Sequence, residues 1–248
     1  MTRLMSGVFA VVAVAAGAYA ISGLSGQNRL PENPLIGAAY AQDAEVDTST
    51  ITEMVQGAED APVTLIEYAS YTCPHCANFH TGPYKKLKEE YIDTGKVKFI
   101  YREVYFDRYG LWASMIARCA GPEKFFGMTD LIFKEQSDWA RAGGATEIVD
   151  ALRKIGRLAG LENDQLEACL QDGTKAQTLV TWYQENAEEH NVTATPSFVL
   201  NGKKIENQSY DSFKALIDAE LEGCSPFRIH ANRKPGPMWP GFSLVISE

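Results

Sequence analysis

The apolar and polar positions of this chain predict strands on either side of a long helical region. Runs typical of strands occupy residues 51–55, 63–68 and 97–101. The second run is apolar at almost every position, as in strands that are buried on both faces. A fourth strand at 195–200 precedes Asn201-Gly202, the pair that most strongly favours a tight hairpin turn. The strands thus form two groups that are far apart in the sequence.

Helical periodicity fills the segment between these groups. From 111 to 189 every strong apolar pattern repeats as in a helix. The clearest helix has Thr146 as its expected N-cap and Gly160 as its stop. Its expected inward face carries Ile148, Val149, Leu152, Ile155 and Leu158. A last amphipathic helix is expected at 211–222, with Phe213, Leu216, Ile217 and Leu221 buried. The fold class is therefore α/β with an all-helical insertion.

These patterns divide the chain into five parts. Residues 1–50 are expected to form a signal peptide or anchor and a flexible lead. The α/β domain begins with 51–106, is interrupted by the helical insertion at 107–189, and is completed by 190–223. Four prolines and little periodicity make 224–248 an extended tail.

The N-terminal part has the features of an export signal. Arg3 precedes the apolar run 8–16, and small residues near Ala20 or near Ala41 suit a cleavage site. If neither site is cut, the segment 4–24 has roughly the 20 residues that a membrane-spanning helix needs. The sequence therefore predicts a periplasmic protein, with an N-terminal membrane anchor as the alternative.

The charge balance excludes one class of function. The chain has 23 Lys and Arg against 32 Asp and Glu, which gives a net charge of -9. A nucleic-acid surface needs clustered positive charge to displace counterions from phosphates. We therefore expect no nucleic-acid partner.

The segment Cys73-Pro74-His75-Cys76 lies between a strand and a helix that is expected to bend at Gly82-Pro83. Cys73 falls at the start of that helix, where unpaired backbone N–H groups favour a thiolate. His75 can add a hydrogen bond or a positive charge, and both lower the pKa of a thiol. Pro74 fits the first helical turn, where its missing donor does no harm. Cys76 lies about one turn further in and is expected to be less exposed.

These features favour redox chemistry over a structural metal site. No second C-x-x-C motif or histidine pair in the sequence completes four metal ligands. Stabilisation of the reduced thiols makes their disulfide a stronger oxidant, so the motif favours oxidation of other thiols. Binding or delivery of a soft metal ion such as Cu(I) by the two thiolates is the non-enzymatic alternative.

The segment from Glu67 to Cys76, the helical insertion and Thr195-Pro196 together resemble the DsbA family of exported thiol oxidases. The resemblance covers about residues 51–222. It implies a thioredoxin fold with an inserted all-helical domain. It also implies a thiol:disulfide oxidoreductase that needs no cofactor.

The resemblance also implies a role for each residue of the site. Cys73 is the nucleophile and leaving group, and Cys76 is its buried partner. Glu67 is the buried acid that carries a proton to or from Cys76. Pro196 follows a cis peptide bond and faces the disulfide, while Thr195 contacts the backbone of the substrate.

The implied reaction transfers the Cys73–Cys76 disulfide to reduced, unfolded or partly folded client proteins through a mixed disulfide at Cys73. A membrane-bound partner would then reoxidise the pair. We expect a monomer, because the sequence contains no recognisable dimerisation module. A disulfide isomerase or reductase is the enzymatic alternative, since a Thr also precedes the proline in isomerase-like relatives.

The remaining cysteines and histidines have simpler interpretations. Some DsbA relatives carry a second disulfide in the helical insertion, which implies a structural bridge between Cys119 and Cys169, although buried free thiols would also pack well there. Cys224 is interpreted as a free thiol. The histidines without metal-site spacing are interpreted as surface residues, namely His80, His190 and His230.

Overall fold

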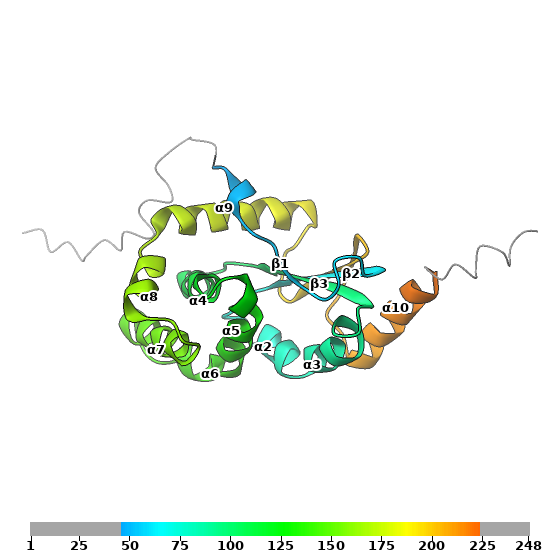
Figure 1. Cartoon of the computed structure of the whole chain (residues 1–248), viewed down its shortest axis with the longest axis horizontal. Coiled ribbons are helices and arrows are strands. Elements are labelled where there is room, and N and C mark those ends of the chain that lie inside the picture. Colours follow the sequence, from blue (N-terminus) through cyan, green and yellow to red (C-terminus); the bar gives the residue numbers. More distant parts are fainter. Residues whose placement is uncertain (1–45, 224–248) are drawn as a thin grey trace, which may run out of the picture. The chain divides into compact units, whose positions relative to one another are not determined.

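The computed structural model describes residues 46–223 of the 248-residue chain (Figure 1). The predicted export segment and the 224–248 tail lie outside the described residues, as do Cys224 and His230. Within 46–223, no helix is both long enough and apolar enough to cross a membrane. The described part begins with a short 3₁₀ turn, η2 (Thr48–Thr50), which the Asp47 side chain caps.

Five strands form one sheet in the order β1-β3-β2-β4-β5. β2 and β3 run parallel, and the other neighbouring pairs are antiparallel. A parallel pair needs a long crossover connection, which the helices between β2 and β3 provide. The central strand β2 leads directly into the cysteine motif. The strands are β1 (Met54–Gln56), β2 (Val63–Ala69), β3 (Val97–Glu103), β4 (Ser197–Leu200) and β5 (Lys203–Ile205).

The predicted hairpin is confirmed at Asn201-Gly202, between β4 and β5. Asn201 and Gly202 have φ angles of 45° and 79°, which matches the left-handed backbone of the tight turns that join twisted strands. β4 begins at Ser197, two residues later than expected, because Pro196 has no N–H to donate to a neighbouring strand.

Helices cover both faces of the sheet. Figure 1 shows α9 along one face and α2, α3 and α10 along the other, with α4 to α8 grouped beside the sheet. The helices before β3 are α2 (Pro74–Thr81), α3 (Pro83–Leu87) and the π-helical η3 (Lys88–Ile92). The later ones are α4 (Arg108–Cys119), α5 (Pro122–Lys134), α6 (Gln136–Trp139), α7 (Ala145–Leu158), α8 (Asn163–Leu170), α9 (Gly173–Glu189) and α10 (Tyr210–Gly223).

Buried aromatic rings join the helical insertion to the sheet. The ring of Tyr71 lies 5.1 Å from Phe133 in α5 and 5.7 Å from Tyr101 in β3, measured between ring centroids. The Tyr71 hydroxyl also lies 2.8 Å from Thr129 Oγ1 in α5. The loop that carries the cysteines is therefore packed between the sheet and the insertion.

The structure corrects two expectations for α7. Gly144 rather than Thr146 is the N-cap, since the helical backbone already begins at Ala145. Leu158 is 69% exposed, although the apolar pattern places it on the inward face. A Cβ added to Gly156 would lie only 2.5 Å from Leu166 Cδ2 in α8. The close approach of α8 at this glycine turns the buried face of α7 away from Leu158.

The helices at the two ends of the α/β domain also differ in detail from the pattern. The expected bend at Gly82-Pro83 is a break, because Gly82 has φ −124° and ψ −97° and separates α2 from α3. In α10, Phe213 and Ile217 are buried as expected, but Leu216 is 37% exposed. The break is local to Gly82 and Pro83, whereas the exposure of Leu216 depends on tertiary packing, which periodicity does not report.

Candidate active site

The cysteine motif is held in place at the end of β2. Cys73 is the N-cap of α2, and Pro74 occupies the first helical position. Gln136 of α6 fixes the loop from the other side: its Nε2 donates to the carbonyl oxygens of Tyr71 at 2.7 Å and Cys73 at 2.9 Å. No sequence pattern pointed to Gln136, because 63 residues separate it from Cys73. The insertion thus contributes directly to the position of the reactive sulfur.

Cys73 is only partly buried, and its surroundings favour the thiolate. The largest contribution is a hydrogen bond from the Cys76 thiol, and the Thr195 side chain and the backbone N–H groups of Cys76 and His75 add to it. Partial burial opposes these contacts, but together they lower the pKa of Cys73 to about 5. Neither Cys73 nor Cys76 is part of the disulfide that the described residues contain.

The Thr195-Pro196 loop faces the sulfur of Cys73. The peptide bond between the two residues is cis, and the Cys73 Sγ lies 3.3 Å from the Thr195 carbonyl oxygen. The Thr195 hydroxyl is buried and favours the Cys73 thiolate, and no hydrogen bond to another described residue competes for it. Beside the loop lies a groove of about 510 Å³ that includes Cys73, Thr193 and the exposed ring of Phe106.

Cys76 has the opposite environment. It is fully buried, and desolvation, the neighbouring Cys73 and the nearby Glu67 all raise the pKa of its thiol. Glu67 is also fully buried in β2, where it lies opposite Tyr101 of β3 and Phe198 of β4. Burial raises the pKa of Glu67, and His80 opposes this shift. Burial thus shifts both the Cys76 thiol and the Glu67 carboxyl group toward their protonated forms.

His80 is the partner of Glu67, and its interpretation as a surface residue is wrong. It is 1% exposed, and its Nε2 lies 2.8 Å from Glu67 Oε2. Its ring stacks on Phe133 at 4.3 Å between centroids, so the helical insertion covers it. The other oxygen of the carboxyl group, Glu67 Oε1, has no hydrogen-bond partner among the described residues. A signal was present in the sequence, since His80 lies four residues after Cys76 on one face of a helix.

Two other histidines differ in exposure. The His75 side chain is exposed and makes no hydrogen bond to another described residue, so the contact it supplies to Cys73 comes from its backbone N–H. His190 is partly buried, and its Nδ1 lies 2.6 Å from the Tyr68 hydroxyl, which corrects its interpretation as a plain surface residue.

The remaining cysteines of the described part lie outside the site. Cys119 at the end of α4 and Cys169 in α8 form a disulfide across 50 residues of sequence, with 6.0 Å between their Cα atoms. Within residues 46–223, no group of three or more His, Cys, Asp or Glu side chains is arranged to hold a metal ion. The arrangement at Cys73 and Cys76 is suited to thiol–disulfide exchange.

Comparison with known proteins agrees with this chemistry. The family profile described as Thioredoxin matches residues 49–219. A Rickettsia bellii (strain RML369-C) protein provisionally named a protein-disulfide oxidoreductase is 34% identical over 196 residues, which are 76% of this chain and 74% of the relative. Disulfide bond formation protein D of Bacillus subtilis (strain 168) is 30% identical over 178 residues, 68% of this chain and 77% of the relative.

A solved structure shows the same likeness. The crystal structure of alpha-DsbA1 from Wolbachia pipientis has a TM-score of 0.64 and 28% sequence identity, and the match covers 69% of this chain and 92% of that chain. The sheet order and the grouped helices described above are consistent with the thioredoxin fold and its helical insertion. The chain therefore belongs to the thioredoxin superfamily and, within it, to the DsbA-like thiol:disulfide oxidoreductases.

Proposed function

We propose that this protein is an exported dithiol oxidase that transfers a Cys73–Cys76 disulfide to reduced client polypeptides. The observation that carries the proposal is the difference in acidity between the two thiols. The pKa of Cys73 is lowered to about 5, whereas the pKa of Cys76 is raised. A Cys73 thiolate stabilises the reduced form at neutral pH, and this makes the disulfide a stronger oxidant.

The reaction has two exchange steps. A substrate thiolate attacks Cys73 Sγ, a substrate–Cys73 disulfide forms, and the bond to Cys76 breaks with its electron pair on Cys76. A second substrate thiolate then attacks the substrate sulfur of this mixed disulfide and releases Cys73 as a thiolate. The substrate loses two electrons to the protein disulfide. Of the two substrate protons, one ends on Cys76 and the other enters the solvent.

We assign the proton for Cys76 to the buried pair of Glu67 and His80. A thiolate at Cys76 is costly because the site is desolvated, so it must gain a proton as it leaves. Glu67 is close enough to raise the pKa of Cys76, and His80 bonds the carboxyl group at 2.8 Å. In this proposal Glu67 exchanges the proton, while His80 is a positioning residue that orients the carboxyl group.

The groove beside Cys73 supports a polypeptide substrate. Its wall contains the backbone of Thr193, Ala194 and Thr195, against which an extended segment can form backbone hydrogen bonds. Phe106 lines the same groove and is 57% exposed, so it offers an apolar contact. Such a site suits chains that are unfolded or partly folded, because their backbone and apolar side chains are accessible.

Two observations support a location outside the cytoplasm. Disulfides such as Cys119–Cys169 persist in oxidising compartments, and the N-terminal sequence has the pattern of an export signal. We propose a periplasmic monomer that a membrane-bound partner reoxidises through the same two cysteines.

Equilibration with reduced and oxidised glutathione tests the direction of exchange. We expect a reduction potential well above that of thioredoxin, which is about −270 mV. We also expect the oxidised protein to oxidise a reduced dithiol peptide rapidly. A couple as reducing as thioredoxin would contradict the oxidase function and favour the reductase alternative. Tight Cu(I) binding without peptide oxidation would instead favour the metal-binding alternative.

A further inference from the structure

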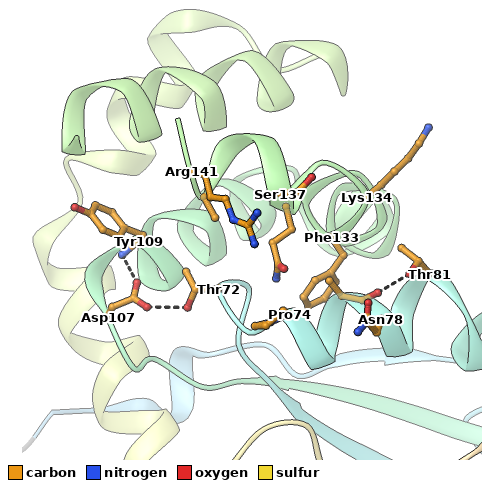
Figure 2. A pocket seen from close by; sticks show the side chains of 13 residues that line it. Thr72, Pro74, Asn78, Thr81, Asp107, Tyr109, Phe133, Lys134, Ser137 and Arg141 are labelled. Atoms are coloured by element: carbon orange, nitrogen blue, oxygen red, sulfur yellow. Dashed lines mark hydrogen bonds between the residues drawn. The ribbon is translucent and has the colours of Figure 1, made fainter. Parts of the chain in front are cut away.

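A second cavity lies next to the cysteine motif and has no role in the reaction described above. Its volume is about 540 Å³, and its walls come from α2, the start of α4, the end of α5 and α6 (Figure 2). Thr72, Pro74 and Asp107 line both this cavity and the groove at Cys73. A polypeptide that occupies the groove can therefore continue past Pro74 into the cavity.

The charged side chains of this cavity differ in their availability to a ligand. The Asp107 carboxylate accepts hydrogen bonds from Thr72 Oγ1 at 2.7 Å and from the backbone N–H groups of Tyr109 and Gly110 at 2.8 and 2.9 Å. It also caps α4, so three donors and the positive end of a helix offset its charge. The one acidic residue of the lining is thus already engaged.

Unlike Asp107, Arg141 has a charge that is available to a ligand. Its guanidinium makes no hydrogen bond or ion pair with any other described residue, and Figure 2 shows it directed over the cavity. Lys134 also belongs to the lining, but its side chain points away from the cavity in the same view. Asn78 and Ser137 add neutral donors to the walls. The cavity therefore combines an available planar cation with neutral hydrogen-bond donors.

We propose that this cavity is a subsite for the carboxylate of an Asp or Glu residue that lies near the reacting cysteine of a client polypeptide, with Arg141 as its binding partner. An arginine fork matches a carboxylate with two parallel hydrogen bonds, so it selects this group by geometry as well as by charge. The proposal rests on the proposed function, because it specifies which client polypeptides the oxidase prefers.

Reduced dithiol peptides test the subsite. One residue at a time on either side of the first cysteine is made Glu, Lys or Ala, and the rate constant for oxidation by the oxidised full-length protein is measured. At one position we expect the Glu peptide to react about three- to tenfold faster than the Lys peptide, as for an arginine pair that is partly open to solvent. This preference should shrink at high salt concentration.

Two variants separate a direct contact from a general effect of charge. Arg141→Glu should reverse the preference, so that the Lys peptide reacts faster than the Glu peptide at the same position. Lys124→Glu makes the same change in net charge on the exposed surface of α5, away from the cavity, and should retain the original preference. Thermal unfolding of each variant checks that the fold is intact.

The possible failures are distinguishable. If the wild-type protein oxidises the Ala peptides but shows no Glu preference at any position, the subsite is wrong and the oxidase function stands. The same conclusion follows if Arg141→Glu keeps the wild-type preference. If the wild-type protein oxidises none of the peptides, the proposed function fails, and with it this inference.

Discussion

The two sulfurs of the Cys-Pro-His-Cys motif lie three positions apart in sequence, in two contrasting regions. Cys73 lies at the open end of α2, where loops and backbone N–H groups surround it and a groove gives access to it. Cys76 lies one turn further along the same helix, fully buried and close to Glu67, which His80 contacts. The pKa of the first thiol is lowered, and the pKa of the second is raised.

In the proposed mechanism, this contrast gives the two sulfurs of one helix different chemical roles. The outer sulfur meets donors that stabilise its negative charge, so it is a good leaving group. The inner sulfur is itself desolvated, so in this mechanism it needs a proton when it leaves. Substitutions in one region at a time test this assignment.

Loss of the outer sulfur should have the largest effect. Cys73→Ser should abolish peptide oxidation, because no other described thiol reaches the groove.

Cys76→Ser leaves Cys73 free to react but removes the inner leaving group. Incubated with a substrate disulfide, this variant should accumulate a mixed disulfide, which mass spectrometry of the intact protein detects. Equal trapping by the two variants would contradict the assignment of Cys73 as the attacking sulfur.

The Cys119–Cys169 disulfide provides a comparison outside both regions. It closes 50 residues within the insertion, so its removal by paired serine substitutions should lower the free energy of unfolding by about 4 kcal/mol in the chain-entropy account. The redox potential of Cys73 and Cys76 should not change. Urea unfolding and glutathione equilibration measure the two quantities, and a shifted potential would show that this disulfide also acts on the site.

The outer region could be predicted from the sequence better than the inner one. The motif and its place after a strand were enough to put Cys73 at a helix start, and the family resemblance brought Thr195 to it across 122 residues. These features depend on the turn from β2 into α2 and on the Thr195-Pro196 loop.

Sequence patterns missed the burial of His80 in the inner region, the contact of Gln136 with the Cys73 loop and the exposure of Leu158, because all three depend on tertiary packing. His80 follows Phe79 in α2, and it is buried by rings from other elements, namely Tyr84, Tyr101 and Phe133. Gln136 holds the Cys73 carbonyl from a helix of four residues, too short to give a periodic signal. Leu158 fits an inward face by periodicity, but the approach of α8 at Gly156 leaves it exposed.

Replacement of the inner acid should slow exchange and stabilise the fold. Glu67→Gln keeps an acceptor for His80 but cannot carry a proton, so reduction of the oxidised protein by a peptide should slow by about tenfold or more. Burial raises the pKa of Glu67, so its contribution to stability is present at low pH and is lost as the pH rises through the folded-state pKa. The stability gain of Glu67→Gln should therefore grow with pH.

His80→Asn is the companion test, since it removes the ring that orients Glu67 but keeps a short hydrogen-bonding side chain. If His80 positions the carboxyl group, this variant should shift the pH profile of the exchange rate, and combination with Glu67→Gln should add little. Independent, additive losses in the double variant would show that the two residues do not act as a unit.

The smallest effect should come from the hydroxyl group of Thr195. Thr195→Val removes a side chain that favours the Cys73 thiolate, so the pKa of Cys73 should rise above about 5, as measured by thiolate absorbance against pH. The thiolate stabilises the reduced fold in full at pH values above the ordinary thiol pKa of 9.0, and this stability is lost as the pH falls through about 5. The variant should lose this stability at a higher pH than the wild type does.

Thr193→Val, in the same groove but without a contribution to the acidity of Cys73, is the matched control. An unchanged pKa in Thr195→Val would show that the Cys76 thiol and the backbone N–H groups alone set the acidity of the outer sulfur.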